Sequence, residues 1–300
     1  LSKKNVLVQD LYSLENLAHV DVLCLDKTGT LTQGKMEVEQ AIVLVPEAKD
    51  AFEKLMGSFL AHTQDNNATF QAIRSYFASS DAFTPTHQIP FSSDRKWSAM
   101  TFEGVGTFLL GAPERLCTGT LPEEVQKGLQ EGKRVLLVGL TKESVSKDQP
   151  LPELNLLAAI IIIDPIREHA ADTISYFQEE GVSVKLISGD NPLTVSEVAK
   201  EAGIVNAEEY VDATTLQTDE DIANAIAKYT VFGRVTPGQK RQFVQALKDQ
   251  GKTVAMTGDG VNDVLALKDA DCSVAMASGS DAACQAAQVV LLESNFACMP

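Results

Sequence analysis

An alternation of short apolar runs with amphipathic stretches, which begins at about residue 156, constrains this chain more than any other feature. Strands that alternate with helices of this length are typical of a parallel sheet. The expected strands are 160–163, 182–187, 230–232, 253–256 and 272–275, and the expected helices are 168–180, 193–202, 219–228, 237–249 and 261–268. An earlier apolar run at 20–25 fits the same sheet. The sequence therefore predicts an α/β fold.

Between residues 37 and 155 the sequence does not show this alternation of strands and helices. Helix-like segments come first and β-like segments follow, at 48–61, 68–78, 97–103, 106–110 and 134–140. We expect an inserted second domain over 37–155, with 1–36 and 156–300 forming the first domain. The loop from Thr141 to Pro152 is expected to lead back to that first domain.

Composition excludes several classes of protein. Forty-one acidic against 25 basic residues give a formal charge of −16, which opposes nucleic-acid binding. The longest apolar run, Leu156 to Ile163, is far shorter than the roughly 20 residues that a bilayer-spanning helix needs. Five cysteines without a C-x-x-C pair favour reduced thiols and a cytosolic setting. The chain opens without Met, and we expect it to be part of a longer protein.

Three segments that carry acidic residues follow expected strands. They are Asp26-Lys27-Thr28-Gly29-Thr30-Leu31-Thr32, Ser188-Gly189-Asp190-Asn191 and Thr257-Gly258-Asp259-Gly260-Val261-Asn262-Asp263. One such segment alone is often only a turn or a helix cap. Three at strand ends of one parallel sheet predict a functional site, because ligands bind beyond the carboxyl ends of the strands.

The residue types in these segments indicate phosphoryl chemistry. Converging carboxylates such as Asp26 and Asp259 repel one another and need a cation, and oxygen ligands suit Mg²⁺. A carboxylate near Mg²⁺ and a lysine stays ionised and can attack a phosphoryl group. Donors that could bind the phosphoryl oxygens come from Thr28, Ser188, Gly189 and Lys240. Thr28 cannot act as a general base that would speed hydrolysis, so an acyl phosphate would persist.

The motifs DKTGTLT at 26–32 and TGDGVND at 257–263 resemble those of the P-type cation-transporting ATPases. The resemblance covers nearly the whole chain and implies the cytoplasmic phosphorylation domain, a Rossmann-like parallel sheet of the haloacid dehalogenase type, with an inserted α+β nucleotide-binding domain. It implies that Asp26 is phosphorylated from Mg-ATP and that Asp26, Asp259 and the Thr28 carbonyl ligate Mg²⁺.

The same resemblance implies further roles in the phosphorylation domain. Asp263 orients Lys240, the lysine that faces the phosphate, and Asn262 and Ser188 approach the phosphoryl group. The segment Asp164-Pro165-Ile166-Arg167 resembles the hinge between the two domains. Asp190 and Arg234 match positions that approach the nucleotide once the domains close.

In the inserted domain, Phe91 to Ser98 resembles the adenine site of the family. Phe91 would stack on the base, Lys96 would lie beside it, and Gly111 and Arg134 match positions at the nucleotide. Two residues depart from the family pattern, because Leu110 stands where lysine is usual and Phe70 where glutamate is common. Loss of a cation beside the nucleotide is expected to weaken ATP binding by roughly 1 to 2 kcal/mol.

We therefore expect the catalytic fragment of a cation-transporting P-type ATPase, with ATP and Mg²⁺ as substrate and cofactor. Its partners would be the missing actuator and transmembrane domains and a transported cation, for which calcium is the expectation. The fragment would lie at the cytoplasmic face of a membrane. One alternative is a phosphatase of the haloacid dehalogenase superfamily with a cap domain, although such enzymes commonly carry a second Asp where Thr28 stands. Another is a nucleotide-binding module without turnover.

Overall fold

The computed structural model describes residues 6–10 and 12–291, and this part of the chain divides into two compact units. The first unit contains the chain up to Lys35 and from Asp164 onward, and the second spans Met36–Ile163. None of the helices in the described residues is both long and apolar enough to span a membrane.

The first unit is built on a sheet that is parallel except at one edge, and its described part has eight strands. This arrangement confirms the predicted α/β fold. In spatial order the strands are β1 (Val6–Val8), β14 (Val289–Leu291), β13 (Cys272–Met276), β12 (Val254–Gly258), β2 (Val22–Asp26), β9 (Ser183–Ile187), β11 (Val231–Gly233) and β10 (Tyr210–Asp212). The antiparallel pair is β1 and β14.

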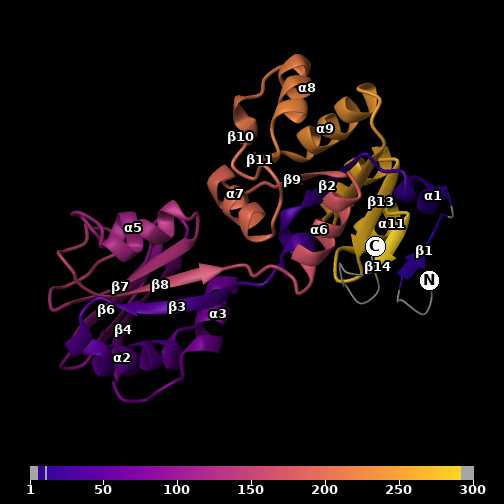
Figure 1. Cartoon of the computed structure of the whole chain (residues 1–300). Coiled ribbons are helices and arrows are strands. Elements are labelled where there is room, and N and C mark those ends of the chain that lie inside the picture. Colours follow the sequence, from indigo (N-terminus) through magenta and orange to yellow (C-terminus); the bar gives the residue numbers. More distant parts are fainter. Residues whose placement is uncertain (1–5, 11, 292–300) are drawn as a thin grey trace. The chain divides into compact units, whose positions relative to one another are not determined.

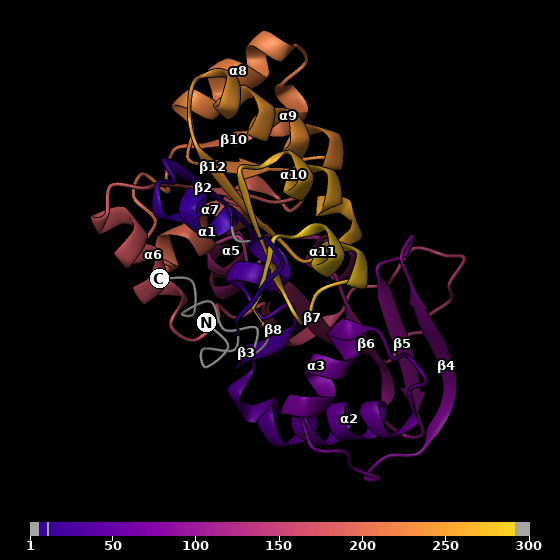
Figure 2. The ribbon, with the colours of Figure 1, turned by 90° about the vertical axis from the view of Figure 1, so that its right-hand side faces the viewer.

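Helices cover both faces of this sheet (Figure 2). One face carries α1 (Tyr12–Ala18), α6 (Ala170–Glu179) and α7 (Pro192–Glu201), and the other carries α8 (Asp219–Lys228), α9 (Pro237–Asp249), α10 (Val264–Asp269) and α11 (Asp281–Ala286). Strand β2 shows why helices must cover both faces of the sheet. Leu23 packs on one side and Cys24 on the other, and both side chains are fully buried.

The second unit is an antiparallel six-stranded sheet. In spatial order its strands are β3 (Glu37–Val43), β8 (Asn155–Ile163), β7 (Arg134–Thr141), β6 (Gly106–Gly111), β5 (Trp97–Phe102) and β4 (Pro85–Ser92). Helices α2 (Lys49–His62) and α3 (Ala68–Tyr76) cover one face, and α4 (Pro113–Leu116) and α5 (Glu123–Gln130) cover the other, as Figure 1 shows for α2 and α5.

The return to the first unit lies after Ile163, and not after residue 155 as the sequence pattern suggests. Strand β8 pairs antiparallel with β3 and β7, so the segment from Thr141 to Pro152 connects two strands of the second unit instead of leading back. The reason is burial on both faces, because Ile160 packs under α2 and α3 while Ile161 packs toward α4 and α5. A central strand covered on both sides has the same continuous apolar sequence as a strand of a parallel sheet.

Candidate active site

The carboxylate of Asp26 lies at the carboxyl end of β2, between β9 and β12, and is almost fully buried. Its backbone N–H donates to the Thr257 hydroxyl on β12 at 3.2 Å. Because central strands of a parallel sheet are buried on both faces, a side chain at this strand end is fixed by the sheet itself.

A tight turn, Lys27–Leu31, carries the chain away from β2. Gly29 within it has a φ of 77°, a conformation that glycine adopts without strain. A Cβ on Gly29 would lie only 1.7 Å from Asp259 Oδ2, so glycine is required for space as well as for conformation. The turn and the Asp259 carboxylate are therefore in close contact.

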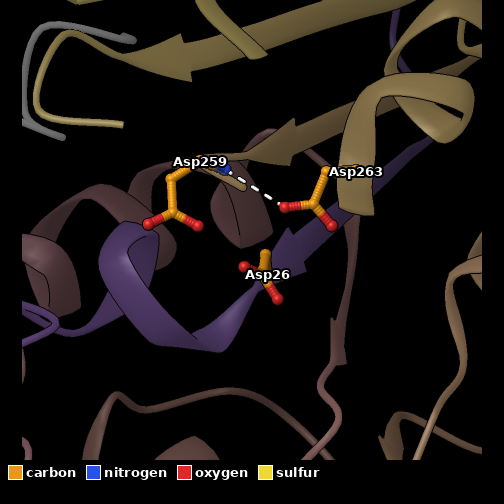
Figure 3. Close-up of side chains that lie close together, drawn as sticks. All are labelled: Asp26, Asp259 and Asp263. Carbon is orange, nitrogen blue, oxygen red and sulfur yellow. Dashed lines mark hydrogen bonds between the residues drawn. The ribbon is translucent and has the colours of Figure 1, made fainter. Parts of the chain in front are cut away.

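Figure 3 shows that Asp26, Asp259 and Asp263 converge. One carboxylate oxygen from each lies within 4.8 Å of the others. Asp263 is fixed by its own loop, since its Oδ2 accepts from the backbone N–H groups of Asp259 at 3.2 Å and Gly260 at 3.1 Å. The acidic motif after β12 is thus folded so that Asp263 supports the loop and Asp259 faces the turn after β2.

Lys240 provides the cation among these carboxylates. It lies in the first turn of α9, whose start is fixed by a capping box between Thr236 and Gln239. Its Nζ donates to Asp263 Oδ1 at 2.6 Å and to Asp26 Oδ1 at 3.1 Å, and all three side chains are buried. A buried lysine held by two carboxylates keeps its place and its charge.

The proton affinities of these groups follow from burial and mutual charge. Burial, opposed by Lys240 and reinforced by Asp263 and Asp259, raises the pKa of Asp26 to about 7. Burial and the neighbouring Asp263 also raise the pKa of Asp259. Burial disfavours the ammonium of Lys240, but Asp26 and Asp263 outweigh it, so the pKa of Lys240 is raised. Three carboxylates therefore share one lysine, and the cluster has an excess of negative charge.

This donor set fits a divalent cation of the Mg²⁺ type. Such ions prefer carboxylate and carbonyl oxygens and keep several of their waters, so one or two protein carboxylates are enough. Asp26 and Asp259 meet this requirement, since Asp263 is engaged by Lys240 and by two backbone N–H groups. A divalent cation at these carboxylates would balance their excess charge and lower the pKa of Asp26.

Other residues singled out from the sequence lie around the cluster in different ways. Ser188 is buried directly after β9, and its hydroxyl accepts the N–H of Asp190 at 3.1 Å. Asp190 forms an ion pair with the buried Lys27 at 2.8 Å. Thr28 and Asn262 are both exposed, and no hydrogen bond found in the described residues joins either side chain to the carboxylates.

The expected hinge is bonded to the turn that follows Asp26. The carboxylate of Asp164 accepts from the Thr32 hydroxyl at 2.6 Å and from the Gly34 N–H at 2.9 Å. Arg167 donates from its guanidinium to the Gly29 carbonyl at 2.6 Å and from its backbone to the Leu31 carbonyl at 2.9 Å. The segment after Ile163 therefore forms hydrogen bonds to the turn in which Gly29 lies against Asp259.

In the second unit, Phe91 is the exposed aromatic residue at the predicted base site. It lies on β4, 37% exposed, with its ring edge against Phe70 at a centroid distance of 6.4 Å. Lys96 lies in the turn before β5 and pairs with Glu114 at 3.0 Å. Gly111 allows β6 to approach this turn, because a Cβ there would be 2.8 Å from the Lys96 carbonyl.

Arg134 and the two departures from the family pattern belong to the same unit. Arg134 is exposed and donates to the Thr69 hydroxyl at 3.2 Å. Leu110 and Phe70 are both buried in the apolar core under α2 and α3. The structure therefore places these two side chains in the core, where they complete its packing.

Two ion pairs of predicted site residues are not predicted by the sequence motifs, although Glu114 itself lies in the segment Gly111-Ala112-Pro113-Glu114, which resembles a family motif. Arg234, at a positive φ of 51°, forms an ion pair with Asp212 at the end of β10. Lys96 is bound by Glu114. Each pair is distant in sequence and depends on tertiary structure, so motif spacing could not reveal it.

A family model for haloacid dehalogenase-like hydrolases matches residues 20–271 of the chain. This range includes the whole second unit and the carboxylate cluster of the first. The chain belongs to this family.

More specific relatives are cation-transporting ATPases. The chain is 48% identical over its whole length to a probable cation-transporting ATPase, exp7, of Streptococcus pneumoniae, of which it covers 39%. It is 40% identical, again over its whole length, to the calcium-transporting ATPase CtpE of Mycobacterium bovis, of which it covers 38%. The chain thus spans about two fifths of the length of these curated relatives.

Solved structures agree on the fold. A crystal structure of a zinc-transporting PIB-type ATPase in the E2.Pi state matches 99% of this chain and 43% of its own, with a TM-score of 0.76 and 23% sequence identity. At this identity the match shows a shared fold for the chain.

Proposed function

We propose that this chain is the catalytic part of a P-type cation-transporting ATPase, in which Asp26 accepts the γ-phosphoryl group of ATP. The observation that carries the proposal is the buried Asp26, whose Oδ1 is held by Lys240 while two further carboxylates lie beside it. A carboxylate nucleophile next to a lysine and a cation-binding carboxylate has the composition needed for phosphoryl transfer.

In the proposed step, Asp26 Oδ2 attacks the γ-phosphorus. An O–P bond forms to Asp26, the bond between the γ-phosphorus and the β,γ-bridging oxygen breaks, and ADP leaves with that electron pair. Lys240 holds the other oxygen of Asp26 and, with Ser188 and Asn262, would donate to the transferred phosphoryl oxygens. Asp263 keeps Lys240 in place through the 2.6 Å contact.

Asp26, Asp259 and the Thr28 carbonyl would hold Mg²⁺. When bound, the ion neutralises negative charge on the carboxylates and on the phosphoryl oxygens. The chain's own contribution is the approach of the turn to Asp259, which depends on Gly29.

Thr28 favours a pump over a phosphatase. A phosphatase needs a general base near the acyl phosphate to activate water, and a threonine hydroxyl cannot serve. The exposed Thr28 lies two residues after Asp26 in the turn, so the aspartyl phosphate would persist until another part of the protein promotes its hydrolysis.

ATP would bind the second unit through its base. Phe91 offers an exposed ring for stacking, Lys96 and Arg134 offer exposed cations, and Gly111 leaves room for the turn that carries Lys96. Asp190 and Arg234 of the first unit are expected to approach the nucleotide. The remainder of the protein would supply the actuator and transmembrane domains and the transported cation, for which calcium is the expectation, with this chain on the cytoplasmic side of a membrane.

Titration of Mg-ATP into isotopically labelled protein tests the proposal, with backbone amide shifts as the measurement. We expect shifts at Phe91, Lys96 and Gly111 from the base and at Asp26 and Lys240 from the phosphates. Shifts confined to Asp26 and Lys240 would contradict a nucleotide-binding second unit and would favour a phosphatase with a cap domain.

A further inference from the structure

Arg234, directly after β11, is held by a residue that the proposed function does not use. Strands β10 and β11 lie side by side and run parallel (Figure 1), and Asp212 at the end of β10 is the register partner of Gly233. Asp212 Oδ2 accepts from the Arg234 guanidinium at 2.5 Å. Its other carboxylate oxygen accepts from the Thr214 N–H at 3.0 Å and from the Thr214 hydroxyl at 2.6 Å. The carboxylate is therefore fixed by its own turn and presents one oxygen to Arg234.

The backbone of Arg234 is fixed as well, in a conformation that is rare for a residue with a side chain. Its φ of 51° lies in the left-handed region, which favours glycine. The Arg234 N–H donates to the Asp190 carbonyl at 2.7 Å, and the Val235 N–H donates to the Ser188 carbonyl at 3.0 Å. Strain of this kind persists where surrounding contacts impose it, and it is often found at ligand-binding sites. Arg234 is thus bonded to the loop after β9, whose Asp190 carboxylate pairs with the buried Lys27.

The guanidinium of Arg234 keeps most of its donors for a ligand. An arginine side chain has five N–H donors in a planar fork. In the described residues this guanidinium makes one hydrogen bond, to Asp212, and the Arg234 side chain is 50% exposed. Because Asp212 already restricts the side chain, less entropy is lost when the remaining donors bind oxygen atoms. Asp212 therefore preorganises Arg234 as a group that binds oxygen.

We propose that Asp212 is a positioning residue that orients Arg234 toward the oxygen atoms of bound ATP. This inference rests on the proposed function, in which Arg234 approaches the nucleotide. A contact that is equally strong in the bound substrate and in the transition state lowers KM without changing the rate at saturation. Loss of Asp212 is therefore expected to raise the KM for Mg-ATP in the phosphorylation of Asp26, with the maximal rate kept.

The Asp212→Asn variant removes the ion pair and keeps the turn. An asparagine oxygen can still accept from Thr214, and its NH₂ group then faces the guanidinium as a second donor. We expect KM to rise by roughly three- to tenfold, because a long side chain must be ordered on binding, while the maximal rate stays within about twofold of wild type. Asp221→Asn is the matched control. Asp221 also accepts from its own turn, from the N–H groups of Gln217 and Thr218, but lies in no ion pair found in the described part of the chain.

A double-mutant cycle with Arg234→Ala tests whether Asp212 acts through Arg234. The measurement is the KM for Mg-ATP in aspartyl-phosphate formation by wild type, the two single variants and the double variant. We expect Arg234→Ala to raise KM at least as much as Asp212→Asn does. Once Arg234 is absent, Asp212→Asn should raise KM no further.

The other outcomes of this cycle contradict the inference in different ways. An equal rise in KM with and without Arg234, or a fall in the maximal rate at an unchanged KM, would mean that Asp212 only supports the fold. A lower KM in Asp212→Asn would mean that the ion pair competes with the nucleotide, and an Arg234→Ala variant with the wild-type KM would mean that Arg234 does not bind it. No phosphorylation of the wild type by Mg-ATP would instead refute the proposed function.

Discussion

The two units hold their proposed functional groups in opposite ways. In the first unit Asp26, Lys240 and Asp263 are buried, and each is bonded to another member of the group. In the second unit Phe91, Lys96 and Arg134 lie at the surface and have contacts mainly with their own turn or a neighbouring element. The first site depends on the fold of a whole sheet, and the second on a few exposed segments.

Because of this difference, the two sites are expected to tolerate amino-acid substitutions to different degrees. Buried charges at strand ends interact strongly, because solvent does not screen them, and removal of the Lys240 cation would leave Asp26 and Asp263 uncompensated. Exposed pairs such as Lys96 and Glu114 contribute little to stability, so their positions can vary. The departures at Phe70 and Leu110 fall in the second unit, where they are accommodated in an apolar core.

The largest effect is expected from Lys240→Met. The variant removes the cation between Asp26 and Asp263, and loss of one such electrostatic contact typically slows catalysis by about 10²- to 10³-fold. The measurement is the initial rate of aspartyl-phosphate formation from Mg-ATP. Lys252→Met, at an exposed position of the same unit, is the control. If the rate of Lys240→Met lay within a few-fold of the control, the buried contacts of the first unit would not be more important for function than the exposed contacts of the second unit.

Gly29→Ala is expected to impair the cation site next. The new Cβ would overlap Asp259 Oδ2, so the carboxylate must move, and we expect Mg²⁺ affinity to fall by about tenfold or more. Gly181→Ala is a matched control, because Gly181 also has a positive φ, 83°, but open space around its Cβ position. Each variant should lose roughly 1 kcal/mol of stability from its positive φ, and Gly29→Ala should lose more because of the overlap with Asp259. Only Gly29→Ala should lose Mg²⁺ binding in a calorimetric titration.

Asp26→Asn is expected to stabilise the metal-free protein at neutral pH. The pKa of Asp26 is raised to about 7 in the folded state, so stability falls as pH rises from about 4 to 7 and the carboxylate ionises. An asparagine removes this cost, and about 1 to 2 kcal/mol would raise Tm by roughly 2 to 8 °C.

Thermal unfolding in chelator at pH 7.5 and pH 5 measures the difference between variant and wild type. The gain should shrink at the lower pH, where wild-type Asp26 is largely protonated. A variant less stable than wild type at pH 7.5 would show that the buried charge of Asp26 is fully compensated by Lys240.

The smallest effect is expected from Glu114→Gln. Both side chains of its pair with Lys96 are more than half exposed, so stability should change by less than about 0.5 kcal/mol. Release of Lys96 from its partner is expected to tighten Mg-ATP binding by a few-fold at most. A large loss of stability in thermal unfolding would mean that the surface of the second unit is as tightly coupled as the interior of the first.

Much of the first unit could be predicted from the sequence. Helices Asp219–Lys228 and Pro237–Asp249 begin and end where the pattern places them, because each starts with a threonine cap and has a regular apolar face. The convergence of Asp26 and Asp259 follows from their positions at the ends of parallel strands. Local signals and the global fold agree in these segments.

Other features depend on tertiary context. The apolar sequence of β8 does not reveal whether its neighbours run parallel or antiparallel, so its assignment to the second unit required the structure. The short strands β10 and β14 have too few residues to show a pattern. The hydrogen bond from the Phe91 backbone N–H to Asp65 joins residues 26 positions apart. Every residue except proline has a backbone N–H, so the sequence cannot show which one Asp65 binds.

Phosphorylation of Asp26 from labelled Mg-ATP tests the central claim most directly. The measurement is acid-stable, hydroxylamine-sensitive phosphate, located by mass spectrometry of the peptide that contains residue 26. We predict incorporation into wild type and none into Asp26→Asn, with ATP still shifting the amides of Phe91 and Lys96 in the variant. Hydroxylamine-sensitive phosphate that persists in Asp26→Asn would contradict the assignment of Asp26 as the nucleophile.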